Sequence, residues 1–391
     1  MIALPRMMTP WRAVAAAFAL NGFLLGNWAA RVPAVMERHG LSEGAFGFQL
    51  LLMGVGALIS FPIAGRMADR RGALPVTRVL TVFYLTTLVF IGLAPGVVAL
   101  GFAVFVFGMC HGAMDVTMNA WATEVEKHLA RPVMSSFHAM WSLGTGAGAA
   151  LGYVATANGL DLAWHFALAP VLAAVFLGPF LGLPWQSETR QAQASDPAFA
   201  LPRGPLILVG FFALSAALGE GATADWSAVY LRDTLGSTEA QATLGFAVFS
   251  VAMVGMRLCA DQLVRRFGAV FIARTCALIA AIGIVLVTGL SSFPAALAGF
   301  FLMGVGYAPL VPLAFSRAAA DRDVPPGQAI AAVATLGYGA LLLGPPVIGQ
   351  IAEISSLRLG LALLGAFAFA VALLAPVLAP ATNTKDAAAA D

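Results

Sequence analysis

Charged residues are scarce in this sequence. Asp, Glu, Lys and Arg make up 10% of its 391 residues, whereas soluble domains carry about 25%, so they are too few to cover a water-exposed globule. Lysine occurs only at Lys127 and Lys385, and no Gly-x-x-x-x-Gly-Lys-Ser/Thr loop is present, which excludes ATP as the energy source. The formal net charge of +2 excludes a broad nucleic-acid surface, which needs clustered excess Lys and Arg.

Cysteine is also rare. The chain has three cysteines, Cys110, Cys259 and Cys276, and each lies in an apolar run. An odd number of distant cysteines indicates neither a disulfide framework nor a thiolate metal site, and the His-Glu-x-x-His pattern of zinc enzymes is missing. We therefore expect no metal, no cofactor and no enzymatic activity.

Hydrophobic residues, by contrast, make up 60% of the chain, and the mean hydropathy is +0.88. A helix needs about 20 apolar residues to cross a membrane, where each backbone polar group must be satisfied within its own segment. Twelve such segments predict an all-α membrane protein. They span residues 11–35, 44–65, 75–94, 97–120, 134–157, 161–184, 205–231, 241–262, 269–290, 294–316, 327–350 and 357–379.

The longest polar stretch, Trp185 to Arg203, separates two sets of six segments. Its composition is typical of a mobile linker. The expected units are an N-terminal six-helix bundle (1–184), a linker (185–204), a C-terminal six-helix bundle (205–380) and a tail (381–391).

The positions of the basic residues predict the orientation in the membrane. Arg31, Arg38, Arg232 and Arg358 fall near one set of loops, and the other basic residues lie near the opposite helix ends. Because cytoplasmic loops carry an excess of Lys and Arg, we expect both termini, and the linker and tail with them, in the cytoplasm.

The two sets of segments share sequence. The loop at 65–72 reads Gly-Arg-Met-Ala-Asp-Arg-Arg-Gly, and a degenerate copy lies at 257–268, with Asp69 and Asp261 192 positions apart. A second match joins 142–147 to 335–340 at an offset of 193. Two separate matches at nearly one offset indicate a duplicated six-helix unit, as in secondary transporters built from repeats.

At these residues the chain resembles the major facilitator superfamily, of which the Gly-x-x-x-Asp-Arg-Arg-Gly loop is the best-known signature. Three further stretches, Ser136–Gly144, Gly219–Trp226 and Gly344–Pro346, resemble a bacterial inner-membrane branch close to the fucose–proton symporters. The resemblance covers roughly residues 11–379. It implies two bundles related by a pseudo-twofold axis, a bacterial inner-membrane location and transport by alternating access.

The resemblance also implies that the repeated loops are gates. A carrier alternates between an inward-facing and an outward-facing conformation. A carboxylate at a helix end that pairs with a neighbouring helix in just one of these conformations stabilises it and shifts the equilibrium towards it. In the alternative interpretation the arginines only fix the topology. The gating candidates in the two loops are Asp69, Arg70, Arg71, Asp261 and Arg265.

Polar side chains inside a membrane are costly, so each is a functional candidate. Segment 97–120 carries His111, Asp115 and Asn119, which are four residues apart and share one helix face. A buried carboxylate without a cation beside it can exchange protons, so we expect Asp115, with His138 at similar depth, to couple transport to protons. Asp115 and Asn119 match the acid and amide of the fucose symporters, but the carboxylate that those proteins carry in their first span is missing here. The alternative is a structural contact of Asp115 with His138.

Segment 205–231 carries two further acids, Glu220 and Asp225. Five residues turn a helix by about 140°, so both can reach one site only if the helix is broken, which Gly219 and Gly221 would permit. We expect Glu220 to line the central cavity and to take part in proton coupling. Asp225 lies nearer the outer end, where we expect it to pair with Arg31 as an outer gate.

Amide, aromatic and histidine side chains are expected to line a site for a small polar solute. Trp28 and Trp226 can alternatively belong to an interfacial belt of aromatic residues. The solute-binding candidates are Asn21, Asn27, Trp28, His111, Asn119, Trp141 and Tyr338.

The function that fits these features is a proton-coupled carrier of a small polar solute such as a sugar. The alternative is a proton-driven efflux antiporter for amphipathic compounds, and a receptor or channel fits poorly with a duplicated unit that buries polar residues. The expected partners are the solute, protons and the lipid bilayer, with no nucleic acid, and the protein is expected to act as a monomer.

Overall fold

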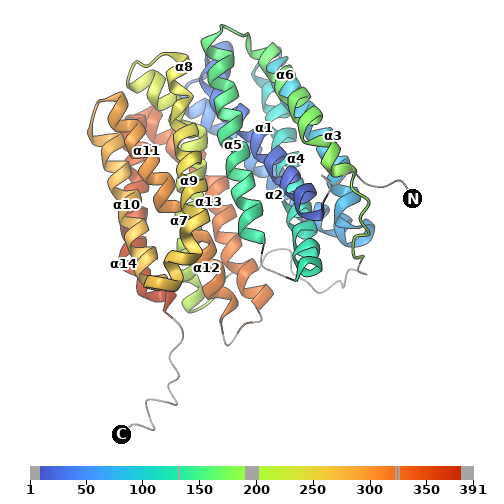
Figure 1. Cartoon of the computed structure of the whole chain (residues 1–391). Coiled ribbons are helices and arrows are strands. Elements are labelled where there is room, and N and C mark those ends of the chain that lie inside the picture. Colours follow the sequence, from blue (N-terminus) through green and yellow to red (C-terminus); the bar gives the residue numbers. More distant parts are fainter. Residues whose placement is uncertain (1–8, 131–132, 190–201, 322–323, 325, 380–391) are drawn as a thin grey trace.

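The computed structural model describes residues 9–130, 133–189, 202–321, 324 and 326–379, and within these ranges it contains helices and no strand. Ten helical segments of this part of the chain are long and apolar enough to cross a membrane, and α5 and α6 complete twelve crossings in two bundles (Figure 1). The predicted twelve-helix membrane fold is therefore confirmed.

The first bundle holds six crossings, and each is one helix. Its helices are α1 (Pro10–His39), α2 (Glu43–Arg71), α3 (Ala73–Gly92), α4 (Val97–Leu129), α5 (Met134–Ala157) and α6 (Leu162–Phe176), which a 3₁₀ turn, η1 (Gly178–Gly182), extends.

In the second bundle some crossings consist of two pieces. Proline at 309 removes a backbone donor, and the crossing there divides into α11 and α12. The elements are α7 (Pro205–Val229) with η2 (Tyr230–Thr234), α8 (Glu239–Ala242) with α9 (Leu244–Phe267), α10 (Ala269–Gly289), α11 (Phe293–Tyr307) with α12 (Leu310–Ala319), α13 (Pro326–Ile354), and α14 (Leu357–Leu374) with η3 (Ala375–Leu378).

Both bundles pack their helices in the same pattern. The pairs α1–α5, α2–α4 and α3–α6 of the first bundle correspond to α7–α13, α9–α11 and α10–α14 of the second. The bundles meet along α2–α13, α5–α9 and α1–α7. This arrangement supports the expected internal duplication and places α1, which is buried along most of its length, next to the interface.

Glycine caps define the offset between the repeats in this region. Gly72 ends α2 at φ 89° and Gly268 ends α9 at φ 83°, a backbone conformation that glycine adopts without strain. These caps, and the starts of α3 and α10 that follow them, are 196 positions apart. The sequence match of Asp69 with Asp261 has an offset of 192 positions. When the two copies are aligned by their glycine caps, these two acids therefore lie one helical turn apart.

Close helix contacts support the same offset. A Cβ on Gly108 of α4 would collide with the Met53 carbonyl oxygen of α2, and a Cβ on Gly304 of α11 with that of Phe249 of α9. Gly108 and Gly304 are again 196 apart. Small residues allow membrane helices to approach this closely.

The first part of the linker lies against the first bundle. The Trp185 indole donates a hydrogen bond to Glu124 Oε2 at 2.7 Å, and the Ser187 hydroxyl accepts one from the backbone N–H of Leu74 at 3.0 Å. Residues 190–201 of the predicted linker and the tail at 381–391 lie outside the described residues.

The molecule has two ends, which differ in the loops that they carry. The terminal end is where α1 begins and α14 finishes. The far end is opposite, and it carries the loops 40–42, 158–161 and 235–238 together with α8 (Figure 1).

Candidate functional site

A network of hydrogen bonds joins four helices near the middle of the first bundle. The Trp141 indole of α5 donates to Asn21 Oδ1 of α1 at 2.8 Å, and the Asn21 amide donates to the His111 backbone carbonyl of α4 at 3.4 Å. The Tyr84 hydroxyl of α3 is 2.8 Å from His111 Nδ1. Three solute-binding candidates, Asn21, His111 and Trp141, are thereby brought together.

Asp115 lies one turn further along α4. The Asn119 amide donates to Asp115 Oδ1 at 3.1 Å, and no described Lys, Arg or His forms an ion pair with this carboxylate. Tyr338 of α13 lies within electrostatic range of Asp115 and packs its ring against Phe61 of α2, with centroids 4.5 Å apart. Asp115 and Asn119 are partly exposed, and this acid has no counter-charge among the described residues.

The polar residues that share one face of α4 have no counterpart in the second bundle. At the offset of 196 that Gly108 and Gly304 define, the positions of His111, Asp115 and Asn119 are occupied by tyrosine, valine and phenylalanine, at 307, 311 and 315. The two halves thus share a fold but differ in the chemistry of this crossing.

A second polar cluster lies where α9 meets the first bundle. Arg257 of α9 forms an ion pair with Glu220 of α7 at 3.4 Å and donates a hydrogen bond to the Ser142 hydroxyl of α5. His138 of α5 lies within electrostatic range of Arg257 and packs edge-on against Phe18, with ring centroids 5.3 Å apart. Glu220 is therefore neutralised by an arginine, and His138 is associated with this cluster and not with Asp115.

The break that Gly219 and Gly221 would permit in α7 does not form. The helix continues from Pro205 to Val229, so Glu220 and Asp225 point in different directions. Asp225 is 4% exposed and has no hydrogen bond or ion pair within the described ranges. The expected pairing of Arg31 with Asp225 is wrong: because α7 stays helical, Asp225 remains among packed helices, and Glu239 of α8 approaches Arg31 at 3.6 Å.

Neither tryptophan for which an interfacial belt was the alternative is exposed. Trp28 packs between Phe46 and Phe107, and Trp226 packs edge-on against Phe46. The belt interpretation is therefore wrong, and complete burial leaves neither ring free to cover a solute in this conformation.

Asn27 belongs to the far end. Its Oδ1 lies 2.8 Å from His165 Nε2 on α6, and its amide donates to the Phe23 carbonyl of α1. The structure therefore separates Asn27 from the network around Asn21.

Three polar contacts cross the bundle boundary at the far end. Their number matters because a contact made in one facing of a carrier stabilises that facing. The contacts are Arg31 with Glu239 at 3.6 Å, Arg232 with Glu37 at 3.2 Å, and the Gly44 backbone N–H with Glu353 Oε2 at 3.0 Å.

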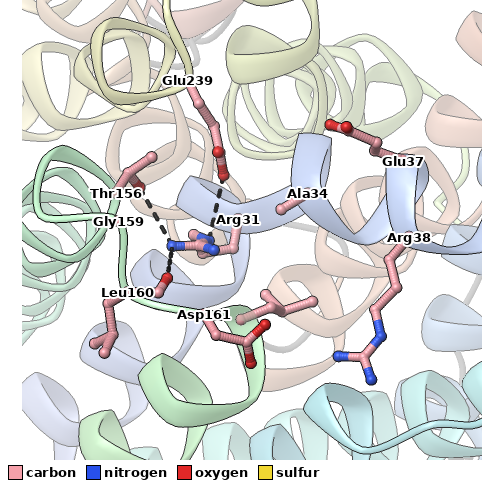
Figure 2. Close-up of a pocket in the computed structure, with 10 residues that line it drawn as sticks. Arg31, Ala34, Glu37, Arg38, Thr156, Gly159, Leu160, Asp161 and Glu239 are labelled. Carbon is pink, nitrogen blue, oxygen red and sulfur yellow. Dashed lines mark hydrogen bonds and ion pairs between the residues drawn. The ribbon is translucent and has the colours of Figure 1, made fainter.

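A pocket of about 450 Å³ lies beside the first of these contacts. Figure 2 shows Thr156, Leu160 and Glu239 approaching the Arg31 guanidinium from different directions. Its N–H groups donate to the Leu160 carbonyl at 3.2 Å and to the Thr156 hydroxyl at 3.4 Å. The remaining lining residues are Ala34, Glu37, Arg38, Gly159, Asp161 and Leu162.

The loop residues expected to gate the terminal end are exposed. Within the part of the chain that the structure describes, they form no ion pair. Their gating role therefore remains a prediction. These residues are Asp69, Arg70, Arg71, Asp261 and Arg265.

Several residues of these clusters were not singled out as site candidates from the sequence. Arg257 and His165 stand inside apolar segments, where the cost of burying polar groups already marks them as candidates. Glu239 lies in a polar loop, and Tyr84 resembles any aromatic residue of a membrane helix. Only the packing of helices distant in sequence reveals the roles of Glu239 and Tyr84.

Comparisons with known proteins agree with this architecture. A family model described as Major Facilitator Superfamily matches residues 13–322. The chain is 53% identical over 373 residues to an uncharacterised transporter, y4wD, of Sinorhizobium fredii, covering 95% of this chain and 99% of that protein. It is 33% identical to an uncharacterised MFS-type transporter of Yersinia pestis, covering 87% and 88% of the two chains.

Solved structures show the same fold. A mutant of the nucleoside transporter NupG superposes with a TM-score of 0.77 at 12% identity, over 95% of this chain and all of that chain. A bacterial homologue of the human lysosomal transporter Spinster, in an inward-facing and unoccupied conformation, gives a TM-score of 0.70 at 14% identity, over 95% and 97% of the chains. At these identities the likeness concerns the fold.

Proposed function

The chain belongs to the Major Facilitator Superfamily and is a multi-pass membrane transporter, and we propose that it moves a small polar solute of the sugar class, coupled to protons, across the bacterial inner membrane. In this proposal the solute contacts the network of Asn21, His111 and Trp141, and Asp115 takes up and releases the coupled proton. Both termini face the cytoplasm, so the far end faces the periplasm.

The observation that carries the proposal is the state of Asp115. This carboxylate lies in the middle of α4, bonded to Asn119 and without a cation among the described residues. Glu220, in contrast, has Arg257 at 3.4 Å. A group without a fixed counter-charge changes its protonation when its surroundings change between two facings, which makes Asp115 a better coupling group than Glu220.

The unequal ends of the molecule support alternating access. The far end carries three polar contacts across the bundle boundary, whereas the gating candidates of the terminal end form no ion pair within the described ranges. These candidates are Asp69, Arg70, Arg71, Asp261 and Arg265. Such a conformation is closed to the periplasm, and the opposite facing requires the far-end contacts to break. One bundle then rocks against the other around the central site.

The proposal is tested in proteoliposomes that enclose a pH-sensitive dye. Neutral monosaccharides and polyols are added outside, and a transported compound should change the internal pH in the wild type. Asp115→Asn should abolish this pH change while exchange of the same compound across the membrane continues. The matched control, Glu188→Gln, removes an acid that forms an exposed pair with Lys127 and should behave as the wild type.

Two outcomes contradict the proposal. If Asp115→Asn still moves protons with the solute, Asp115 is not the coupling group. If no neutral polar compound changes the internal pH, but a pH gradient drives amphipathic dyes out of the vesicles, the protein is an efflux antiporter.

A further inference from the structure

The pocket beside Arg31 is separate from the proposed solute site. Arg31 follows Asn21 by ten positions on α1, which at 1.5 Å per residue places them about 15 Å apart along the helix axis. Nine of its ten lining residues belong to the first bundle, and Glu239 of α8 belongs to the second. The pocket is therefore complete only while the bundles meet at the far end.

The pocket contains an ion pair whose two facing atoms make no hydrogen bond. Arg31 Nε and Glu239 Oε1 are both buried without a hydrogen-bond partner, and at 3.6 Å they are too far apart to bond each other. The Arg31 side chain is 5% exposed and that of Glu239 is 36% exposed. A group that accepts a hydrogen bond from Arg31 Nε and donates one to Glu239 Oε1 would therefore satisfy both atoms, which the ion pair at 3.6 Å does not.

The chemistry of these two atoms selects the group. A carboxylate accepts from Arg31 but repels Glu239, and an ammonium donates to Glu239 but repels Arg31. A hydroxyl has one donor and two acceptor lone pairs, so its oxygen can accept from Arg31 Nε while its hydrogen bonds to Glu239 Oε1. The pair must widen by about 1 Å to admit that oxygen, because two hydrogen bonds of about 2.8 Å then span it.

We propose that this pocket is a second binding site, for a small neutral polyol that bridges Arg31 and Glu239. Its volume of about 450 Å³ falls in the range of small-molecule sites, about 300–1,000 Å³. Further acceptors for hydroxyl groups line it: the Asp161 and Glu37 carboxylates and the Thr156 hydroxyl. Because the ligand contacts both bundles, it binds better to the conformation closed at the far end, and its occupancy slows transport.

Thermal shift on the purified full-length protein tests the site, because a ligand of the folded state raises apparent stability. The probes are mannitol, sorbitol, glucose and galactose at up to about 10 mM, low enough to avoid general stabilisation by osmolytes. At least one should stabilise the wild type. Binding should weaken about tenfold or more, or about 1.4 kcal/mol, in Glu239→Ala, and should largely persist in Glu239→Gln, which keeps an acceptor oxygen.

Two control variants show whether binding depends on this pocket in particular. Glu353→Gln removes another far-end contact outside the pocket and should retain binding, which excludes a general effect of loosening that end. Asn119→Ala changes the proposed central site and should also retain binding. The test of the second site is therefore independent of the proposed function.

The charged analogues glucosamine and glucuronate should bind about tenfold more weakly than glucose, if glucose is a ligand. Equal binding of a charged analogue, undiminished binding in Glu239→Ala, or no stabilisation by any of the four neutral probes would overturn the proposal.

Discussion

Arg257 of α9 donates a hydrogen bond to the Ser142 hydroxyl of α5, and this contact joins the two bundles inside the helix packing. The same guanidinium pairs with Glu220 of its own bundle at 3.4 Å. The equivalent position in the first bundle, 196 residues earlier, is Phe61, whose ring packs at a tilt against that of Tyr338 of α13. The helix pairs α5–α9 and α2–α13 occupy equivalent positions at the interface between the bundles. The first pair is joined by a polar contact and the second by an aromatic contact.

Removing Arg257 should destabilise the protein more than removing the whole ion pair. Arg257→Met leaves the Glu220 carboxylate without its counter-charge, which costs about 3–5 kcal/mol for a fully buried pair and less here, because the two side chains are 13% and 21% exposed. The double variant Glu220→Gln with Arg257→Met should recover much of the loss. Thermal unfolding in detergent measures both, and a double variant no more stable than the single one would contradict the assignment.

Breaking the far-end contacts should open that end. In a background in which the three native cysteines are replaced, Ala34→Cys reports access to the pocket through its reaction with a membrane-impermeant maleimide. Exposed ion pairs contribute about 0.2–1 kcal/mol, so Glu37→Gln together with Glu353→Gln should increase labelling about two- to fivefold. Glu188→Gln is the control and should leave the labelling rate unchanged. A rate that stays constant in the double variant would show that these contacts do not hold the end closed.

Asp69→Asn should reduce transport without affecting membrane insertion. The predicted role of the loop is to pair with a neighbouring helix in the opposite facing, and the amide loses that electrostatic attraction. Transport rates in vesicles, normalised to the amount of inserted protein, measure the effect. A normal rate would leave Arg66, Arg70 and Arg71 as topological anchors only.

Gly108→Ala should destabilise the first bundle. The added Cβ would collide with the Met53 carbonyl oxygen of α2, and overpacking of this kind costs about 1–3 kcal/mol. Gly255→Ala in α9 is the matched control, because a Cβ there meets nothing within 4 Å, and removing a helix glycine should be neutral or stabilising. Equal melting temperatures of the two variants would contradict the close approach of α2 and α4.

Apolar runs predicted the helices closely. The segment expected at 134–157 is α5 with the same bounds, and most other edges agree within a few residues, because the length needed to cross a membrane and the cost of unsatisfied backbone leave few alternatives. The internal duplication could also be predicted, although the offset of the Asp69 loop differs by one turn, since its second copy is longer between the acid and the glycine cap.

Side-chain partners across helices could not be predicted in this way. Arg31 pairs with Glu239 and not with Asp225, and α7 continues past two glycines because tertiary packing on both sides supports a helix that those residues alone would permit to break.

The sequence by itself determined that the chain crosses a membrane, where its helices begin and end, and which polar residues those helices bury, since these properties follow from local composition and the solvent. Only the tertiary structure decided that Asp115 remains without a cation while Glu220 receives Arg257, and that Arg31 meets Glu239 at one end of the interface. Such pairings depend on how helices distant in sequence are rotated and packed against each other, and the hydropathy pattern does not determine that rotation.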